Sequence, residues 1–288
     1  LDYVVFLDNL KLGDVNRSTR ESIFYGGKGI NVSTILNTLG LETTALGFVA
    51  GFTGKAIEDG LAAQGIHTDF IHLPEGNVKV KHGDETEING QGPVITEEAI
   101  NELFAKLDTL TKEDILVLAG SIPNTLPEDI YEKILARLES KGIRVVVDAT
   151  KDLLLNVLKY HPFLIKPNNH ELGEMFGTVC KTDEDIVHYA KKLQEKGAVN
   201  VLISMAGDGA ILITEDGQNI KMGTPKGKVV NSVGAGDSMV AGFVAGYLRG
   251  GSYEEALKSG TAAGSATAFS EGLASLEMYE KMLKQISE

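Results

Sequence analysis

A short stretch that ends in Asp237 has the composition of a phosphate-handling site. Gly234, Ala235 and Gly236 precede a segment whose large apolar residues recur at helical spacing as far as Leu248. Small residues at a helix start let an anion approach the unpaired N–H groups of the first turn. A carboxylate there repels an anion, so Asp237 makes sense if it takes a proton from a nucleophile that attacks the anion. Complementation of the helix dipole by Asp237 explains the tetrapeptide equally well.

A second glycine-rich stretch has the same character. Residues 26–31 read Gly-Gly-Lys-Gly-Ile-Asn and lead into an amphipathic segment that closes at Gly40. Glycines ahead of a helix leave the backbone bare where a ligand can come close. Among the lysines, Lys28 is favoured as a phosphate partner because of its glycine neighbours. An ordinary turn between a loop and a helix gives the same pattern.

Asn168 and Glu171 form a candidate metal site. They are three residues apart at a predicted helix start, so both side chains can point the same way. An amide oxygen and a carboxylate are hard donors that suit Mg²⁺, which keeps most of its waters and is shared with substrate phosphates. The alternative is an ordinary helix cap, in which Asn168 accepts a hydrogen bond from the N–H near Glu171.

The loop Ser204–Gly209 follows one apolar strand and precedes another. It is a candidate for wrapping a nucleotide phosphate with backbone N–H groups, and a hairpin turn is a sufficient alternative. Two common phosphate motifs are absent. Ala56 interrupts a Gly-x4-Gly-Lys-[Ser/Thr] pattern after Gly54, and Met239 interrupts Gly-x-Gly-x-x-Gly. These absences argue against a P-loop enzyme and a dinucleotide dehydrogenase.

The elements that must position these residues alternate along the chain from residue 96 onward. Helix-like and strand-like segments in alternation predict a parallel sheet with helices on both faces. Ligands of such sheets bind at the carboxyl ends of the strands, which here carry Gly120–Pro123, Asp148, Lys166–Glu171 and Ser204–Gly209. The predicted helices are 96–107, 127–139, 152–160, 169–176 and 182–196, and the predicted strands are 115–119, 145–148, 163–165, 201–205 and 210–214.

The first part of the chain predicts a different kind of structure. Leu1–Leu7 is a strand by composition, and a polar stretch follows it. Residues 78–81 and 86–88 alternate in character around a turn at 82–85, which is typical of a hairpin exposed on one side. We assign the hairpin and the polar stretch to a small β-lid. Between them, Thr43–Val49 is predicted to be a buried strand and Gly54–Gln64 a helix.

Composition limits the possible classes of protein. The chain has 288 residues, is 43% apolar and carries a net charge of -13. It can bury a large core, so a disordered or fibrous protein is excluded. The acidic balance argues against nucleic acid or an anionic membrane as the main partner, and no apolar run approaches the ~20 residues of a membrane helix. The single Cys180 excludes an internal disulfide framework and suits a reducing cytoplasm. The chain begins with Leu1 rather than Met, so we expect the encoded protein to be longer.

Five motifs in this order resemble the ribokinase-like carbohydrate kinases, and the resemblance spans nearly the whole chain. Residues 87–93 and 262–269 are similar to the phosphosugar branch, and most of all to its bacterial fructose-1-phosphate kinases. The resemblance implies a ribokinase-like α/β fold in one domain, 1–288, with a central, mostly parallel sheet, helices on both faces, and a β-sheet lid from about 8–25 and 71–93. The five motifs are Gly26–Asn31, Gly120–Pro123, Lys166–Asn168 with Glu171, Ser204–Gly209 and Val233–Asp237.

The resemblance also implies a role for each motif. Asp237 would deprotonate the sugar hydroxyl, and the N–H groups of Gly234, Ala235 and Gly236 would form the anion hole for the γ-phosphoryl group. Mg²⁺ would be held through its waters by Asn168 and Glu171. The remaining implied contacts are with ATP, through Ser204, Gly207, Asp208 and Gly209, with its adenine end, through Ala263, Gly264 and Thr267, and with the sugar phosphate, through Asp2, Gly27, Lys28 and Asn31.

The activity implied by the resemblance is ATP- and Mg²⁺-dependent phosphorylation of D-fructose 1-phosphate to fructose 1,6-bisphosphate. The alternatives are a tagatose-6-phosphate kinase and a catalytically silent regulator that binds sugar phosphate or nucleotide. A cytoplasmic homodimer that forms through the lid is expected. Such kinases usually carry Thr-Arg-Ile before the hairpin, whereas residues 74–79 here read Pro-Glu-Gly-Asn-Val-Lys. We therefore expect a further lid segment, with a phosphate-clamping arginine, between Gly76 and Asn77.

Overall fold

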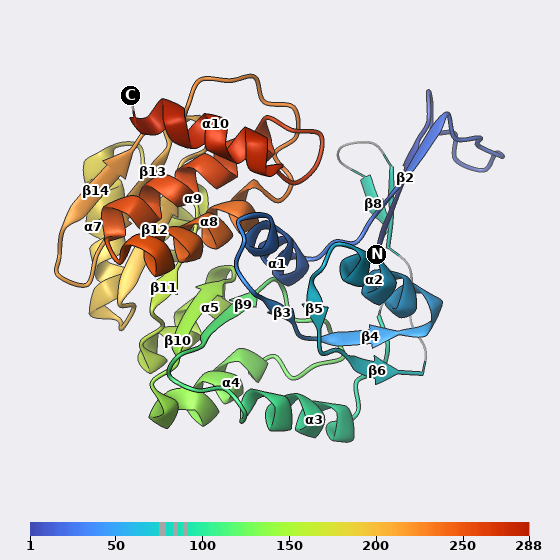
Figure 1. Ribbon diagram of the computed structural model, residues 1–288, viewed down its shortest axis with the longest axis horizontal. Coiled ribbons are helices and arrows are strands. Elements are labelled where there is room, and N and C mark those ends of the chain that lie inside the picture. The colour runs from blue at the N-terminus through green and yellow to red at the C-terminus, as the bar shows by residue number, and fades with distance from the viewer. Residues whose placement is uncertain (75–78, 83–85, 89–91, 288) are drawn as a thin grey trace.

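The computed structural model describes residues 1–74, 79–82, 86–88 and 92–287. A six-stranded sheet lies at the centre of the larger part of the molecule (Figure 1), in the order β14-β13-β12-β11-β10-β9. Its first four strands in sequence pair in parallel, and the fifth and sixth are each antiparallel to the strand before, so the predicted mostly parallel sheet is confirmed. The strands are β9 (Ile115–Ala119), β10 (Arg144–Asp148), β11 (Leu164–Ile165), β12 (Asn200–Ser204), β13 (Ala210–Ile213) and β14 (Asn219–Met222).

Alternate residues of these strands pack into two separate cores. Val145 and Val147 belong to one apolar cluster, and Val146 between them belongs to the other. The first cluster is covered by α3 (Glu97–Leu107), α4 (Ile130–Leu138), α5 (Lys151–Val157), α6 (Asn169–Met175) and α7 (Asp183–Glu195). The second is covered by α1 (Lys28–Thr38), α8 (Ala235–Gly250), α9 (Tyr253–Ala268) and α10 (Leu276–Ser287). Helices on both faces explain why the strands read as continuous apolar runs.

The helix starts follow from their capping residues. The hydroxyl of Thr96 accepts a hydrogen bond from the N–H of Ala99, and Thr182 and Asn168 each form a reciprocal capping box. All five predicted helices from residue 96 onward are present, with ends shifted by the local caps. The sequence made no prediction for α10 or for the short edge strand β14.

The predicted strand Thr43–Val49 is wrong in one respect, because the structure divides it. β3 (Thr44–Ala45) pairs with β5 (His67–Thr68), whereas β4 (Phe48–Ala50) pairs with β6 (Ile71–Leu73). The two halves bond different partners, so they form separate two-stranded parallel sheets and not one buried strand. The next helix, α2 (Gly51–Ala63), begins earlier than the predicted Gly54 because it follows β4 directly.

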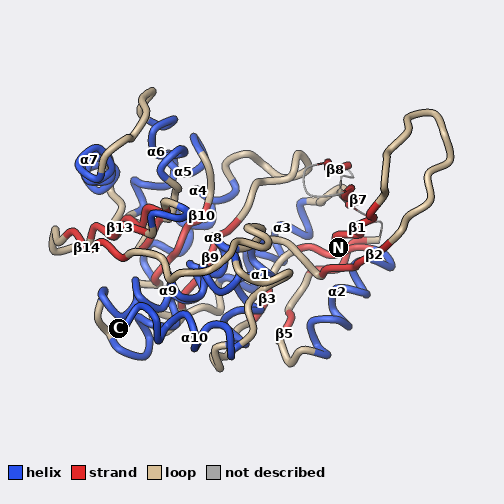
Figure 2. Tube along the Cα trace, turned by 90° about the horizontal axis from the view of Figure 1, so that it is seen from above, coloured by secondary structure: helices blue, strands red, loops and turns tan. Residues whose placement is uncertain are grey.

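The lid is a second sheet with the strand order β2-β1-β7-β8. β1 (Asp2–Phe6) is antiparallel to β2 (Arg20–Phe24) and parallel to β7 (Lys79–His82), which is paired with β8 (Thr86–Ile88) in the predicted hairpin. The opening strand is therefore part of the lid. The loop between β1 and β2 extends away from the body in both views (Figures 1 and 2). The turn residues 83–85 and Val78 lie outside the described residues. The expected segment between Gly76 and Asn77, with its phosphate-clamping arginine, is wrong, because these two residues are consecutive in the full sequence.

No helix among the residues that the structure describes combines the length and apolar character needed to cross a lipid bilayer.

Candidate active site

A cleft of about 1490 Å³ opens at the carboxyl ends of the parallel strands, where it is joined by the starts of α1 and α8. This is the edge at which wound parallel sheets bind ligands. Residues from all of the predicted groups meet there. Those that line it are Asp2, Gly27, Lys28, Asn31, Asn168, Glu171, Ser204, Gly207, Asp208, Gly234, Ala235, Gly236, Asp237 and Gly264.

Asp237 lies in the first turn of α8 and is only 5% exposed. The amide Nδ2 of Asn31 donates a hydrogen bond to its Oδ2 at 2.8 Å. Burial raises the pKa of Asp237 above its ordinary value. The hydrogen bond from Asn31 opposes that rise, Asp148 adds to it, and Lys28 and Lys166 oppose it. A buried carboxylate with a raised pKa is suited to accept a proton.

The backbone before Asp237 turns sharply. Gly234 has a left-handed conformation with φ of 79°, which a residue with a side chain rarely adopts. The N–H of Ala235 donates to the carbonyl of Ser232 at 3.2 Å, so it already has a partner. Within the described residues, no hydrogen bond from the N–H of Gly234 or Gly236 is formed. Of the predicted anion hole, these two amides are the ones free to meet an anion.

Asp148, at the end of β10, forms ion pairs with two lysines that line the cleft. Its Oδ2 lies 3.1 Å from Lys28 Nζ, and its Oδ1 lies 3.3 Å from Lys166 Nζ. Lys166 is buried and its ammonium group borders α8, since a Cβ built on Gly236 would lie 3.3 Å from Nζ. The sequence favoured only Lys28 for this environment. The sequence placed Lys166 at a strand end and in one of the five motifs, but it did not predict that this lysine is buried, because its burial depends on the neighbouring strands.

The predicted metal residues form the helix cap that was their alternative interpretation. Asn168 Oδ1 accepts from the N–H of Glu171 at 2.8 Å, and Glu171 Oε2 accepts from the N–H of Asn168 at 2.8 Å. Both residues line the cleft nonetheless. Among the described residues, no cluster of His, Cys, Asp and Glu side chains is placed to hold a metal ion by itself.

The loop after β12 is a tight turn, and its residues Ser204 to Asp208 line the cleft. The N–H of Met205 donates to the carbonyl of Gly209 at 2.8 Å, and Thr224 donates to the carbonyl of Gly207 at 2.8 Å. Gly209 does not line the cleft. A Cβ at Gly209 would lie 1.9 Å from the carbonyl oxygen of Met222, so only glycine fits this turn.

Only one of the three predicted adenine-side residues lines the cleft. Gly264 lines the cleft, but Ala263 and Thr267 do not, because they face the packing between α8 and α9. The hydroxyl of Thr267 is hydrogen-bonded to that of Ser238 at 2.7 Å. Helical spacing places these residues on the inner face of α9, whereas Phe269, which the sequence did not single out, lines the cleft.

The opposite end of the cleft is built from the lid and the start of α1. Asp2 from β1 lies against the glycine turn, since a Cβ on Gly26 would lie 3.1 Å from its Oδ2. Gly27 is the residue before α1, and Lys28 and Asn31 follow in the first turns of that helix. Phe48 and Phe70 form part of the apolar lining here. A polar floor with an apolar wall suits a small, hydroxyl-rich ligand.

Together, the wound sheet, the lid and a buried carboxylate at a helix start, with two lysines held nearby by a second carboxylate, define a phosphotransferase of the ribokinase-like fold. The chain belongs to the pfkB family of carbohydrate kinases, which it matches over residues 2–278. Membership makes the chain a carbohydrate kinase and implies ATP as its co-substrate.

Individual relatives resemble the chain over almost its full length. The 1-phosphofructokinase of Bacillus subtilis (strain 168) is 47% identical over 289 residues, which cover 99% of this chain and 95% of that protein. The D-tagatose-1-phosphate kinase of Bacillus licheniformis is 38% identical and covers 99% of this chain and 95% of that protein. The crystal structure of Escherichia coli phosphofructokinase-2 in complex with fructose-6-phosphate has a TM-score of 0.90 at 25% identity, covering 100% of this chain and 96% of that one.

Proposed function

We propose that the protein transfers the γ-phosphoryl group of ATP to the C6 hydroxyl of D-fructose 1-phosphate. The observation that carries the proposal is Asp237, a buried carboxylate with a raised pKa at the start of α8. The full-length similarity to a 1-phosphofructokinase supports the choice of sugar. The roles assigned to individual residues below follow from the geometry of the cleft.

In the proposed reaction, Asp237 accepts the proton of the C6 hydroxyl as that oxygen attacks the γ-phosphorus. The new bond joins O6 to phosphorus, the bond from phosphorus to the bridging oxygen breaks, and ADP leaves with that oxygen. The N–H groups of Gly234 and Gly236 face the charge that develops on the moving group. Lys28 and Lys166, which are paired with Asp148, supply positive charge to the same part of the cleft.

Mg²⁺ fits this site as an ion held mainly by water and phosphate. Asn168 and Glu171 offer hard oxygen atoms at the edge of the cleft, but both are already engaged in the capping box. They suit a role in which they bind the waters of the ion and do not replace them. When bound, Mg²⁺ neutralises charge on the nucleotide phosphates. The chain's own groups bind the sugar, hold the base and exclude water.

The nucleotide is proposed to lie along the loop Ser204–Gly209 with its base towards Gly264 and Phe269. Ser204 to Asp208, Gly264 and Phe269 line one continuous cleft with Gly234 and Gly236. The sugar is proposed to lie on the lid side, against Asp2, Gly27 and Asn31, with its phosphate near Lys28. Closure of the lid sheet would exclude water, so that ATP is not hydrolysed in place of transfer.

One specific observation favours a second substrate, D-tagatose 1-phosphate, because a kinase named for that sugar is 38% identical over nearly all of this chain. Tagatose differs from fructose in configuration at C4 alone. A coupled ADP-release assay should compare kcat/KM for fructose 1-phosphate, tagatose 1-phosphate, tagatose 6-phosphate and fructose 6-phosphate. The proposal requires fructose 1-phosphate to lead this panel. Nucleotide binding without turnover of any of them would favour the silent regulator.

We propose that the lid also mediates dimerisation. Apolar side chains on its strands and loop are strongly exposed, including Leu12 at 93%, Val15 at 86% and Ile23 at 55%. A second lid is an occupant of matching chemistry for such a face. Sedimentation of the parent and of an Ile23→Glu variant tests this. A parent that sediments as a monomer would contradict it.

A further inference from the structure

The proposed reaction gives no role to the carboxylate of Asp148. It ends β10 and is only 3% exposed, so its charge is removed from water. Each of its carboxylate oxygens faces the ammonium group of a different lysine. Lys28 begins α1 and Lys166 follows β11, so two elements distant in sequence meet at this single side chain.

The two lysines differ in how deeply their side chains are buried. The side chain of Lys166 is 6% exposed, whereas that of Lys28 is 41% exposed. Burial alone would lower the pKa of Lys28, but the charge and hydrogen bond of Asp148, together with the charges of Asp237 and Glu171, leave that pKa raised. The two ammonium groups lie on opposite oxygens of one carboxylate, and its negative charge offsets the repulsion between them.

The two lysines lie beside the first turn of α8, which we call the mouth of α8. Lys166 Nζ borders Gly236, and both Lys28 and Lys166 act on the charge of Asp237. A phosphoryl group bound at the free amides of Gly234 and Gly236 would therefore have an ammonium group beside it. Phosphoryl transfer depends on such charges being fixed before the reaction.

We propose that Asp148 is a positioning residue that holds Lys28 and Lys166 beside the mouth of α8, in the geometry that phosphoryl transfer requires. Asp148 lines the cleft, but each of its carboxylate oxygens faces a lysine, so it acts through the two lysines and through its charge on Asp237. This role rests on the proposed kinase function. It predicts that loss of Asp148 damages the rate of transfer and spares the affinity for nucleotide.

The direction of the binding effect follows from charge. Asp148→Asn removes a negative charge from an anion site, so the affinity for ATP is maintained or increased. At the same time, the lysines lose the group that aligns them, and kcat falls by about 100-fold, the cost of losing one oriented donor in other enzymes. A residue that merely maintained the fold would lower kcat and nucleotide affinity together.

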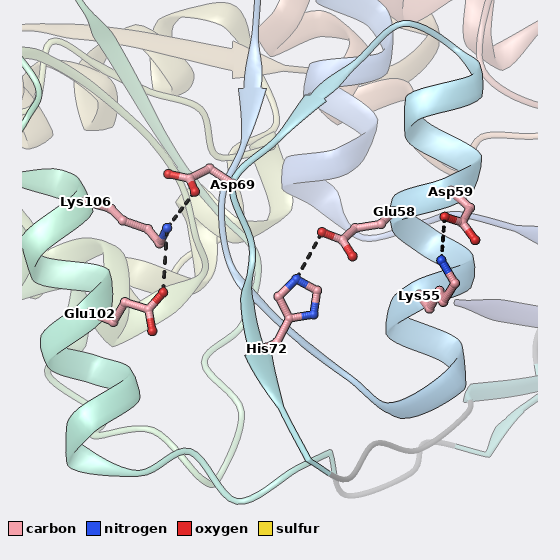
Figure 3. A network of polar contacts seen from close by, with 7 residues as sticks. All are labelled: Lys55, Glu58, Asp59, Asp69, His72, Glu102 and Lys106. Atoms are coloured by element: carbon pink, nitrogen blue, oxygen red, sulfur yellow. Dashed lines mark hydrogen bonds and ion pairs between the residues drawn. The ribbon is translucent and has the colours of Figure 1, made fainter.

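The experiment is a double-mutant cycle with Asp148→Asn, Lys28→Met and both together. Steady-state kcat on the preferred phosphosugar and the Kd of a non-hydrolysable ATP analogue are measured for each protein. Asp148→Glu is included because it keeps the charge and tests the position alone. The matched control is Asp69→Asn, which removes an ion pair with Lys106 (2.6 Å) outside the cleft (Figure 3).

The proposal expects a large loss of kcat in Asp148→Asn with no rise in Kd, and a loss several-fold smaller in the Lys28→Met background. Asp148→Glu should lie between Asp148→Asn and the parent, and Asp69→Asn should match the parent. Parent-like kcat in Asp148→Asn, a parallel loss of nucleotide affinity, or full additivity with Lys28→Met would each overturn it. An inactive parent would contradict the kinase function instead. Crystal structures of the parent and Asp148→Asn test the positioning directly. The proposal expects Lys28 Nζ to leave its position in Asp148→Asn, and an unchanged position would contradict it.

Discussion

Asn31 and Asp237 are 206 residues apart in sequence, and a hydrogen bond of 2.8 Å joins their side chains. The bond connects the first turn of α1, where the sugar is proposed to bind, to the first turn of α8, where the proposed base lies. It favours the charged form of Asp237 and so works against the effect of burial on the pKa of that carboxylate. The hydrogen bond therefore links the proposed sugar-binding loop directly to the proposed base.

We predict that Asn31→Ala raises the pKa of Asp237 further, because the hydrogen bond that stabilises the carboxylate is lost. The acid limb of the pH profile of kcat/KM should move to higher pH, and part of the activity should return as the pH is raised. Asn37→Ala, which removes a hydrogen bond to the carbonyl of Gln64 at the other end of α1, is the control. An unmoved acid limb in Asn31→Ala would contradict the link.

We predict that Asp237→Asn makes the folded protein more stable at neutral pH. Burial raises the pKa of Asp237, so the folded state binds its proton more tightly than the unfolded state does. The charged carboxylate thus lowers the free energy of unfolding at pH values above the raised pKa. That penalty disappears as the pH falls below the unfolded value of about 3.9. Thermal unfolding from pH 7 downwards should show a gain in Tm that shrinks with pH, and a variant less stable than the parent at pH 7 is the contrary result.

The capping box at Asn168 and Glu171 gives a prediction that separates the cap from the metal role. Asn168→Ala should lose about 0.5–2 kcal/mol of stability, since the N–H of Glu171 loses its acceptor. Asn168→Asp should keep the cap, because a carboxylate also accepts that bond, and should change the Mg²⁺ concentration that gives half-maximal rate. If Asn168→Asp leaves the Mg²⁺ dependence unchanged, the metal role is excluded and the cap remains.

Gly60 and Tyr25 give a prediction about the base of the lid. Gly60 lies in the middle of α2, where alanine would normally add roughly 1 kcal/mol of helix stability. A Cβ at Gly60 would, however, lie 2.2 Å from the ring of Tyr25, which connects β2 to the glycine turn before α1. Gly60→Ala should displace that ring and raise KM for the sugar phosphate more than KM for ATP. The double variant with Tyr25→Leu should recover part of the loss, and equal changes in both KM values would contradict this.

The sequence predicted the features that depend on residues close together in the chain. The alternation of strands and helices predicted the wound sheet, and the glycines before Asp237 and Lys28 predicted where the cleft would be. Membership of the pfkB family confirms the resemblance and the α/β fold that it implied. The capping box at Asn168 was also foreseen, as the alternative to a metal site.

The features that the sequence did not reveal depend on contacts across the fold. The sequence placed Lys166 at a strand end but not beside Asp148, because that contact depends on the pairing of β10 with β11. Thr267 belongs to a stretch that resembles an adenine site, yet its position in α9 turns it towards Ser238. The division of Thr43–Val49 into two strands is set by their partners β5 and β6, which no local pattern identifies.

The most direct test of the account is a single-turnover measurement of phosphoryl transfer by Asp237→Asn with ATP and fructose 1-phosphate. Because Asn cannot accept the proton, the rate should fall by about 10²–10⁴-fold, while the Kd of a non-hydrolysable ATP analogue stays close to that of the parent. Transfer at a rate near that of the parent would contradict the assignment of Asp237 as the base and, with it, the proposed mechanism.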